Sequence, residues 1–147
     1  ENVLIGAFLN TPIKSQASET AEKILTLLEL QKYRDDHPTK LPLAMKKKVE
    51  IARALATSPK ILLLDEVMGG LNTSETDQLT GTVRELNNEG ITIVIIEHKM
   101  RCIMSLAERI IVLDSGKKIA EGVPEEISQN DDVIRAYLGD KYNAQNN

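Results

Sequence analysis

The sequence has little of several features that mark particular classes of protein. Its 147 residues include a single cysteine, Cys102, which excludes an intrachain disulfide framework and is typical of a reducing compartment. Nothing nearby would activate this thiol, so we expect Cys102 to be a small buried hydrophobe. No apolar run approaches the roughly 20 residues that a membrane-spanning helix needs, and we therefore expect a soluble chain.

An excess of basic residues is also absent. The 18 lysines and arginines are outnumbered by 22 acids, which gives a formal net charge of −4. Because phosphate backbones require a basic face, we do not expect nucleic acid as the main partner. The sequence opens on Glu1 without an initiator methionine or a secretory signal, and we expect that it begins inside a longer protein.

The strongest positive signal is a short apolar run that ends in two carboxylates. Ile61 to Leu64 are followed by Asp65 and Glu66, and Pro59 precedes the run. This pattern predicts a strand buried on both faces of a parallel sheet, with the carboxylates at its C-terminal end. Ligands bind at that edge of α/β sheets, where such acids suit magnesium near phosphates and a water that must be oriented. An ordinary strand end with two solvated acids is the alternative.

Apolar periodicity and capping signals predict the remaining elements. Polar segments with proline over Thr11–Ser18 and Gln31–Lys40 predict a linker and a loop. In the second helix the predicted inner stripe leaves Lys46 to Lys48 largely outside it. We expect helices over Glu19–Leu30, Ala44–Thr57, Thr73–Glu89, Met100–Ala107 and Asp132–Leu138, a helical turn from Pro124, and strands over Ile61–Asp65, Ile91–Ile96, Arg109–Asp114 and Lys117–Glu121.

Three stretches in one order resemble the signature helix, the Walker B strand and the switch histidine of ABC-type ATPases. They are Leu41–Leu55, Ile61–Glu66 and Ile93–His98, and their common order is more specific than any one motif. The resemblance implies an α/β fold: part of a P-loop NTPase (RecA-like) parallel sheet core with an inserted helical subdomain, a C-terminal hairpin and helices. It implies a helical subdomain over residues 1–58, the C-terminal part of the ATPase core over 59–139 and a disordered tail over 140–147.

The same resemblance assigns roles to individual residues. Asp65 would hold magnesium, Glu66 would polarise the attacking water, and His98 would sense the γ-phosphate. A lone histidine at a strand end is otherwise more often a structural hydrogen-bonding group. The loop that contains Gly70 and Asn72 matches the loop through which two ATPase subunits communicate across a dimer. Asn72 stands where many members have aspartate, which keeps a helix cap but removes a charge.

The signature stretch departs from the family pattern. Many relatives have Leu-Ser-Gly-Gly-Gln where this chain has Leu-Pro-Leu-Ala-Met, so the serine hydroxyl and the glycines that let amides approach a phosphate are missing. A helix N-terminus followed by Lys46 to Lys48 remains, and these lysines either form a solvated face or steer phosphate. The resemblance implies six nucleotide-contacting positions: Pro42, Leu43, Ala44 and Met45 in this stretch, and Gly70 and Asn72 in the intersubunit loop.

The sequence also lacks the phosphate-binding loop, since no Gly-x-x-x-x-Gly-Lys-[Ser/Thr] motif occurs. Two histories fit: a fragment of a full ATPase, inactive alone, or a protein that lost nucleotide binding and serves as an interaction module. We expect the fragment, because Asp65, Glu66 and His98 are all present. In the family the strand that leads into the missing loop lies between the strands matching Ile91–Ile96 and Arg109–Asp114. Because that strand is missing, two strand edges would be left unpaired. We expect that the two strands close up on each other, that their edges pair with another chain, or that the sheet needs more protein than this sequence contains.

Four stretches, of which those in the tail discriminate best, are similar to the ATPase subunits of branched-chain amino-acid importers. The stretches are Val67–Asn72, Ile96–Met100, Gly122–Ile127 and Ala136–Gly139. A branch that powers lipopolysaccharide export is the near alternative, and the cargo itself is read by other subunits. The resemblance implies ATP and Mg²⁺ as cofactors, a second ATPase subunit and transmembrane permease subunits as partners, and a cytoplasmic location on the inner face of the membrane.

Overall fold

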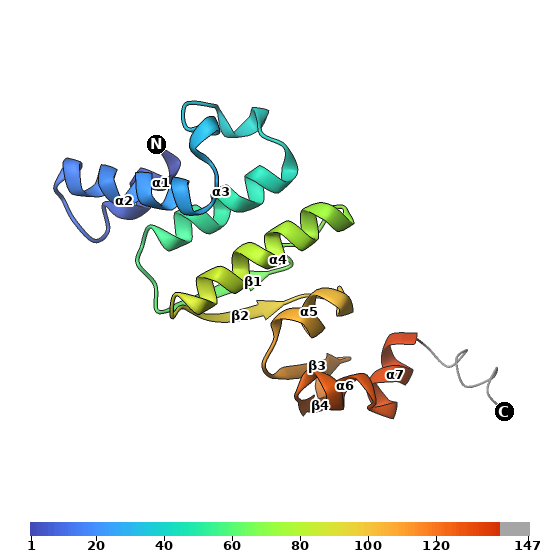
Figure 1. Cartoon of the computed structure of the whole chain (residues 1–147). Helices are drawn as coiled ribbons and strands as arrows, with labels where there is room; N and C mark the ends of the chain where they lie inside the picture. Colours follow the sequence, from blue (N-terminus) through green and yellow to red (C-terminus); the bar gives the residue numbers. More distant parts are fainter. Residues whose placement is uncertain (139–147) are drawn as a thin grey trace. The chain divides into compact units, whose positions relative to one another are not determined.

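The computed structural model describes residues 1–138 (Figure 1). The chain forms two compact units, Glu1–His98 and a second unit that begins at Lys99. The first contains α1 (Asn2–Ala7), α2 (Lys14–Leu27), the 3-10 turns η1 (Gln31–Tyr33) and η2 (Pro38–Lys40), α3 (Leu43–Leu55), β1 (Ile61–Asp65), α4 (Thr73–Asn88) and β2 (Thr92–Ile96). The second contains α5 (Met100–Leu106), β3 (Ile110–Asp114), β4 (Lys117–Gly122), α6 (Pro124–Ser128) and α7 (Asp131–Leu138).

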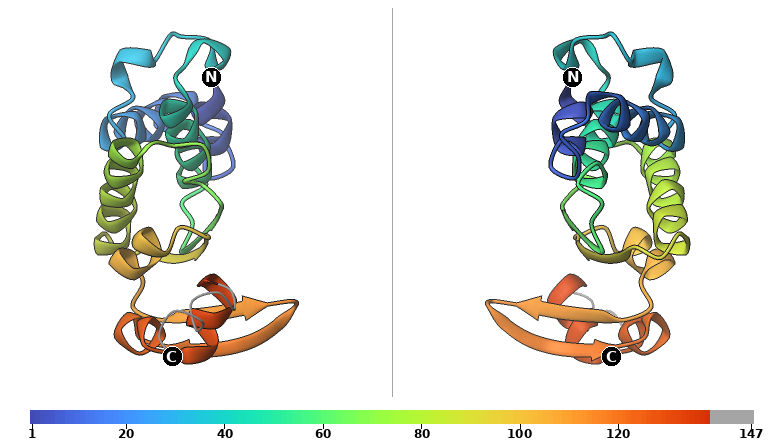
Figure 2. Two further views of the ribbon diagram at one scale, coloured as in Figure 1. Left: turned by 90° about the vertical axis from the view of Figure 1, so that its right-hand side faces the viewer. Right: turned by 90° about the vertical axis from the view of Figure 1, so that its left-hand side faces the viewer.

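Helices α1, α2 and α3 pack against one another, as Figure 2 shows from two sides. Gly6 permits the close approach of α1 to α3: a Cβ there would lie 2.7 Å from the carbonyl oxygen of Arg53. Helix α2 begins at Lys14, earlier than predicted. The Thr11 hydroxyl group accepts a hydrogen bond from the Ile13 N–H at 3.2 Å, and this turn lets part of the predicted linker enter the helix.

The buried face of α3 differs from the predicted stripe. Lys48, which we expected outside that stripe, is only 5 % exposed, and its Nζ lies 3.1 Å from Oε2 of Glu29. Glu29 follows α2 in a left-handed conformation with φ of 58°, which places a carboxylate beside the buried ammonium. Lys48 is therefore a buried lysine paired with an exposed carboxylate, and it belongs neither to a solvated face nor to a phosphate-steering group.

Strands β1 and β2 form a parallel pair in which Ile61 lies opposite Thr92 and Asp65 opposite Ile96. Figure 1 shows α4 alongside this pair, and Leu62 and Leu64 of β1 are buried. The alternate residues of the pair are exposed: Ile61 57 %, Leu63 72 %, Val94 49 % and Ile96 62 %. Our expectation that β1 is buried on both faces is wrong for this chain, because the described residues cover only one face.

Helix α4 agrees closely with its prediction. Asn72 accepts a hydrogen bond from the Glu75 N–H at 3.0 Å, and the Glu75 carboxylate accepts one from the Asn72 N–H at 3.0 Å. These reciprocal bonds form the capping pair that the sequence predicts. Leu79, Val83 and Leu86 form the buried face of the helix, also as expected.

The second unit is built on an antiparallel hairpin of β3 and β4. Ser115 and Gly116 have φ of 48° and 76°, the left-handed values that a tight hairpin turn requires. Helices α6 and α7 contact β4. Cys102 in α5 is 4 % exposed, which confirms its expected burial.

The strand order in residues 1–138 is β1-β2 in one sheet and β3-β4 in another. The two sheets belong to different units, so the expected closing up of β2 and β3 stays a prediction. Pairing with another chain and a need for more protein stay predictions. The expected boundary between residues 58 and 59 lies inside the first unit, and the expected tail over 140–147 lies outside the described residues. Among residues 1–138, no helix has the length and apolar character that membrane crossing needs.

Candidate functional site

The C-terminal end of β1 carries the two predicted site carboxylates. The chain leaves the strand at Asp65, and Glu66 adopts a left-handed φ of 46°. Two backbone hydrogen bonds hold it there: the Glu66 N–H donates to the Ile96 carbonyl at 2.9 Å, and the Glu66 carbonyl accepts from the Gly69 N–H at 3.0 Å. A non-glycine residue pays roughly 1–2 kcal/mol for this conformation, and such strain is found often at functional sites.

Glu66 and His98 meet across the ends of the two parallel strands. Nδ1 of His98 lies 3.6 Å from Oε1 of Glu66, and their side chains are 67 % and 63 % exposed. An exposed pair of this kind adds little to folding stability. Its significance is its placement, because the structure brings two predicted catalytic residues within reach of one solvent-accessible position.

The carboxylate oxygens at the strand end suit magnesium only when phosphate oxygens complete its coordination shell. Asp65 is exposed and offers carboxylate oxygens, which Mg²⁺ prefers. In residues 1–138 no group of three or more His, Cys, Asp or Glu residues could enclose a metal ion. Magnesium sites of nucleotide enzymes use one or two carboxylates and complete their shell with water and phosphate oxygens, and Asp65 fits that arrangement.

The loop after β1 is anchored by its apolar residues. Val67, Met68 and Leu71 are buried, whereas Gly70 and Asn72 are exposed. Gly70 has φ of 76°, and a Cβ there would lie 2.8 Å from Cδ2 of Leu43. The structure thus brings together two predicted nucleotide-contacting positions from separate stretches. Asn72 already uses its side-chain oxygen to cap α4.

The N-terminus of α3 carries the other predicted nucleotide-contacting residues. Pro42 is the N-cap residue and makes no side-chain capping bond. Leu43 is 44 % exposed, whereas Ala44 is 8 % exposed and Met45 is half-buried. Backbone amides at this helix start are the groups that could meet an anion, but their surroundings here are mainly apolar.

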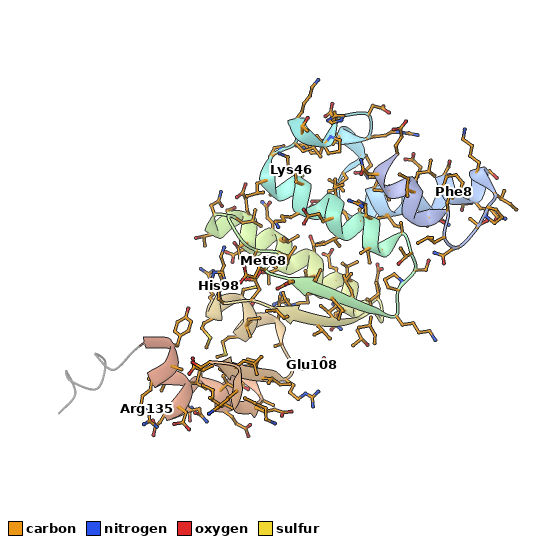
Figure 3. The ribbon with its side chains drawn as sticks, turned by 180° about the vertical axis from the view of Figure 1, so that it is seen from behind. Phe8, Lys46, Met68, His98, Glu108 and Arg135 are labelled. Atoms are coloured by element: carbon orange, nitrogen blue, oxygen red, sulfur yellow. The ribbon has the colours of Figure 1, made fainter. Side chains whose placement is uncertain are left out.

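Sequence reasoning missed one residue of this region, Glu97. Its Oε1 accepts a hydrogen bond from the Met68 N–H at 2.7 Å, and its Oε2 is buried without a hydrogen-bond partner in the described residues. Figure 3 labels Met68 and His98 at the same end of the strand pair. The only signal in the sequence is that Glu97 directly precedes His98, and that position alone does not indicate a buried contact with a residue 29 positions away.

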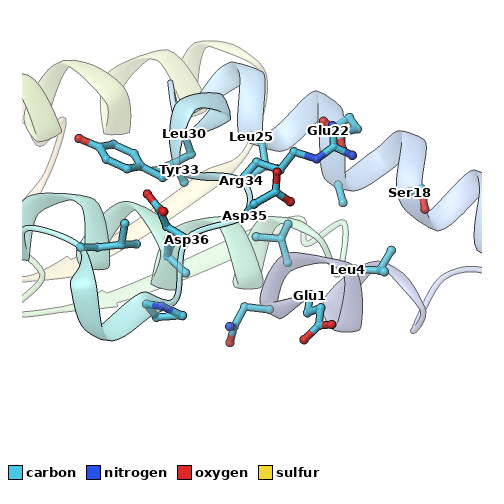
Figure 4. A pocket seen from close by; sticks show the side chains of 16 residues that line it. Glu1, Leu4, Ser18, Glu22, Leu25, Leu30, Tyr33, Arg34, Asp35 and Asp36 are labelled. Carbon is cyan, nitrogen blue, oxygen red and sulfur yellow. The ribbon is translucent and has the colours of Figure 1, made fainter.

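A cavity of about 260 Å³ lies among the helices of the first unit (Figure 4). Its wall includes Glu22 and Arg34, whose side chains form an ion pair at 2.7 Å. None of the predicted site residues lines it. The cavity is therefore separate from the carboxylates at the end of β1.

Two family descriptions match the chain. The family described as ABC transporter matches residues 1–69, and the family described as branched-chain amino acid ATP-binding cassette transporter matches residues 117–143. Among solved structures, an ATP-binding cassette of an ABC transporter in its ADP conformation superposes with a TM-score of 0.77 at 32 % identity, over 83 % of this chain and 50 % of that one. The cbiO1 protein of Clostridium perfringens gives a TM-score of 0.80 at 26 % identity, over 97 % of this chain and 58 % of that one.

Relatives of known function have similar sequences over nearly the whole chain. LivG of Salmonella typhimurium, a high-affinity branched-chain amino acid transport ATP-binding protein, is 41 % identical over 93 % of this chain and 56 % of its own length. BraF of Pseudomonas aeruginosa, with the same description, is 38 % identical over 95 % of this chain and 56 % of its own. The chain thus spans about half the length of these relatives. The chain is thus similar in sequence and fold to the ABC transporter family of ATP-binding proteins, the family that its motif order indicates.

Proposed function

We propose that this chain is part of an ATP-hydrolysing subunit of an ABC transporter. The observation that carries the proposal is the meeting of Glu66 and His98, 3.6 Å apart at the ends of paired parallel strands. Such strand ends are where α/β enzymes bind nucleotides. In the proposed site Asp65 precedes both residues as the carboxylate that meets magnesium.

Each side chain has a role suited to its chemistry. The Glu66 carboxylate accepts a hydrogen bond from the attacking water and polarises it, and His98 donates a hydrogen bond towards the terminal phosphate. Asp65 would hold Mg²⁺, which neutralises phosphate charge when it is bound with ATP. The exposure of Glu66 and His98 leaves both side chains accessible to water and nucleotide.

The second group of residues would serve a nucleotide shared with another subunit. Gly70 and Asn72 lie in the proposed intersubunit loop, and the start of α3 presents backbone amides beside them. The apolar residues at this start weaken its hold on phosphate relative to a serine and glycine sequence. The second ATPase subunit, identical or different, is proposed as a partner.

We propose branched-chain amino acids as the cargo of the whole transporter. The match of residues 117–143 to the branched-chain family description and the 41 % identity to LivG support this cargo. The alternative is lipopolysaccharide export, since LptB of Haemophilus influenzae is 32 % identical over 86 % of this chain and 53 % of its own length. Transmembrane permease subunits are the proposed membrane partners, with the ATPase subunit held on the cytoplasmic face.

Substitution of Glu66 in a full-length subunit with a phosphate-binding loop tests the function. Glu66→Gln should lower the rate of ATP hydrolysis by about 100-fold or more, because it removes the group that polarises water, and should leave ATP-driven dimerisation unchanged. Glu85→Gln on the exposed face of α4 is the matched control. A rate for Glu66→Gln close to that of the control would refute the proposed role.

The 147-residue chain alone should bind ATP weakly. The missing loop supplies most phosphate contacts in P-loop enzymes, and Asp65 acts on a metal that the nucleotide helps to hold. Isothermal titration calorimetry with magnesium and ATP measures this affinity, and micromolar binding by the isolated chain would contradict the expectation. The reading frame upstream of Glu1 separates the alternatives: a phosphate-binding loop there supports the ATPase, whereas a start codon favours an interaction module.

A further inference from the structure

Glu97 joins the ends of the two strands through its side chain. Its Oε1 accepts the Met68 N–H at 2.7 Å, and Met68 is 0 % exposed. A second link lies two residues before Met68 and one residue before Glu97, where the Glu66 N–H donates to the Ile96 carbonyl at 2.9 Å. Glu66 therefore lies at one link and within two residues of the other, and His98 directly follows Glu97.

The chemistry of this contact is unusual for a purely structural one. An ionised carboxylate accepts up to four hydrogen bonds and donates none. Glu97 uses one oxygen in a short bond, while Oε2 is buried with no partner in residues 1–138. A buried, unsatisfied acceptor is unfavourable for folding, so folding stability alone does not explain a glutamate at this position. An acidic side chain does give a stronger bond to an amide than a neutral one would.

We propose that Glu97 is a positioning residue for the catalytic pair. Its hydrogen bond to Met68 holds the loop of residues 67–72 at a fixed distance from the end of β2, so that Glu66 and His98 keep their spacing when the loop meets a second subunit. This inference rests on the proposed ATPase function only for its catalytic consequence. The structural link itself is testable in the present chain.

Amide hydrogen exchange of the 147-residue chain tests the link directly. In Glu97→Ala the Met68 amide should exchange at least about tenfold faster, the factor expected for loss of one hydrogen bond to a charged group. The Leu64 amide, within β1, should be unchanged, and Glu97→Gln should lie between the parent and Glu97→Ala because its amide oxygen still accepts a hydrogen bond, though a weaker one. Glu89→Ala, on an exposed residue after α4, is the control. Equal acceleration at Leu64 and Met68, or no change at Met68, would overturn the proposal.

Kinetics in the full-length subunit with a phosphate-binding loop test the consequence. Glu97→Ala should lower kcat for ATP hydrolysis about tenfold, with KM for ATP changed less than about twofold, because the catalytic pair loses alignment while nucleotide contacts remain. Glu97→Gln should restore most of kcat. An unchanged kcat in Glu97→Ala, or a loss that Glu97→Gln does not restore, would overturn the positioning role.

The two tests separate this inference from the proposed function. A parent subunit that hydrolyses no ATP would contradict the ATPase proposal, and the exchange of the Met68 amide would still decide the link. A parent that hydrolyses ATP normally, with an unaffected Glu97→Ala variant, would leave the ATPase proposal intact and refute the positioning role.

Discussion

The C-terminal end of the β1-β2 pair and the N-terminus of α3 present different kinds of chemical group. The strand end presents Asp65, Glu66 and His98, with Glu66 and His98 3.6 Å apart. The start of α3 presents Pro42 and an exposed Leu43 in place of the serine and glycine of the signature motif that the sequence resembles. In an ABC dimer one region would act on the water and metal, and the other would grip a phosphate through amides and a hydroxyl group.

The two regions differ in the groups on which their proposed roles depend: side chains at the strand end and backbone amides at the helix start. The proposed site at the strand end would work through side chains, so a few residue types at one edge define it. The proposed site at the helix start would work through its backbone, and there the side chains must be small to let a phosphate approach. At the N-terminus of α3, Leu43 instead lies against Gly70, so an apolar contact within the chain occupies the position beside the helix start.

The largest effect is expected at the strand end. His98→Ala in a full-length subunit should lower ATP hydrolysis by about 100-fold, because it removes a positioned hydrogen-bonding group from the reaction. His37→Ala is the control: Nδ1 of its exposed ring lies 2.8 Å from the Thr39 hydroxyl group and accepts a hydrogen bond from the Thr39 N–H at 3.4 Å, both within the short η2 turn. Steady-state ATPase assays measure both. Equal rates for the two variants would mean that the strand end is not the catalytic region.

A smaller change is expected at the helix start. A full-length variant that carries Pro42→Ser, Leu43→Gly, Ala44→Gly and Met45→Gln should form its ATP-driven dimer about tenfold more tightly, because a hydroxyl donor and close amides add charge-assisted bonds to phosphate. Size-exclusion chromatography over a range of ATP concentrations measures the change. Weaker or unchanged dimerisation would show that the present helix start is already adapted to its ligand.

The close approach of Leu43 to Gly70 should have a measurable effect on the free energy of unfolding when Gly70 is substituted. Gly70→Ala introduces a Cβ 2.8 Å from Leu43 at a φ of 76°, and should lower the free energy of unfolding by more than the roughly 1–2 kcal/mol of left-handed strain alone. Gly90→Ala, at φ of 93° with no atom within 4 Å of the added Cβ, gives the strain by itself.

Urea unfolding of a double-mutant cycle separates the two contributions. In a Leu43→Ala background, Gly70→Ala and Gly90→Ala should lower the free energy of unfolding by similar amounts, because the steric contact is gone. An excess for Gly70→Ala that persists in this background would mean that Leu43 does not constrain the loop.

The smallest effect lies in the second unit, outside both regions. Hydrogen bonding to Lys118, at 2.9 Å, lowers the pKa of Glu121, and the charges of Lys118 and Arg109 act in the same direction. Its folded pKa lies below the unfolded value of 4.5, so its contribution is present above that value and is lost as pH falls through the folded pKa.

Urea midpoints at neutral and acid pH test this assignment. The parent should lose slightly more stability than Glu121→Gln as pH falls below 4.5, and Glu108→Gln, an exposed residue of the same unit, should behave like the parent. An identical pH dependence in all three proteins would exclude a contribution from Glu121.

Local patterns in the amino-acid sequence determined much of this protein. The apolar run into Asp65 and Glu66 defined β1, since a strand needs only consecutive residues of the right type. The capping of α4 by Asn72 and the turn at Ser115 and Gly116 are local in the same sense. The order of three motifs identified the family, and the matches to known relatives confirmed it.

The tertiary structure decided what depends on distant partners. Lys48 is buried because Glu29, from another element, meets its ammonium, and helical periodicity cannot indicate such a partner. The continuous apolar run of β1 is typical of a strand covered on both faces, and the exposure of its second face reflects which elements the described residues provide to cover it. Glu97 became part of the site only when folding brought its carboxylate to the Met68 amide, because a hydrogen bond between remote residues leaves no periodic pattern in a single sequence.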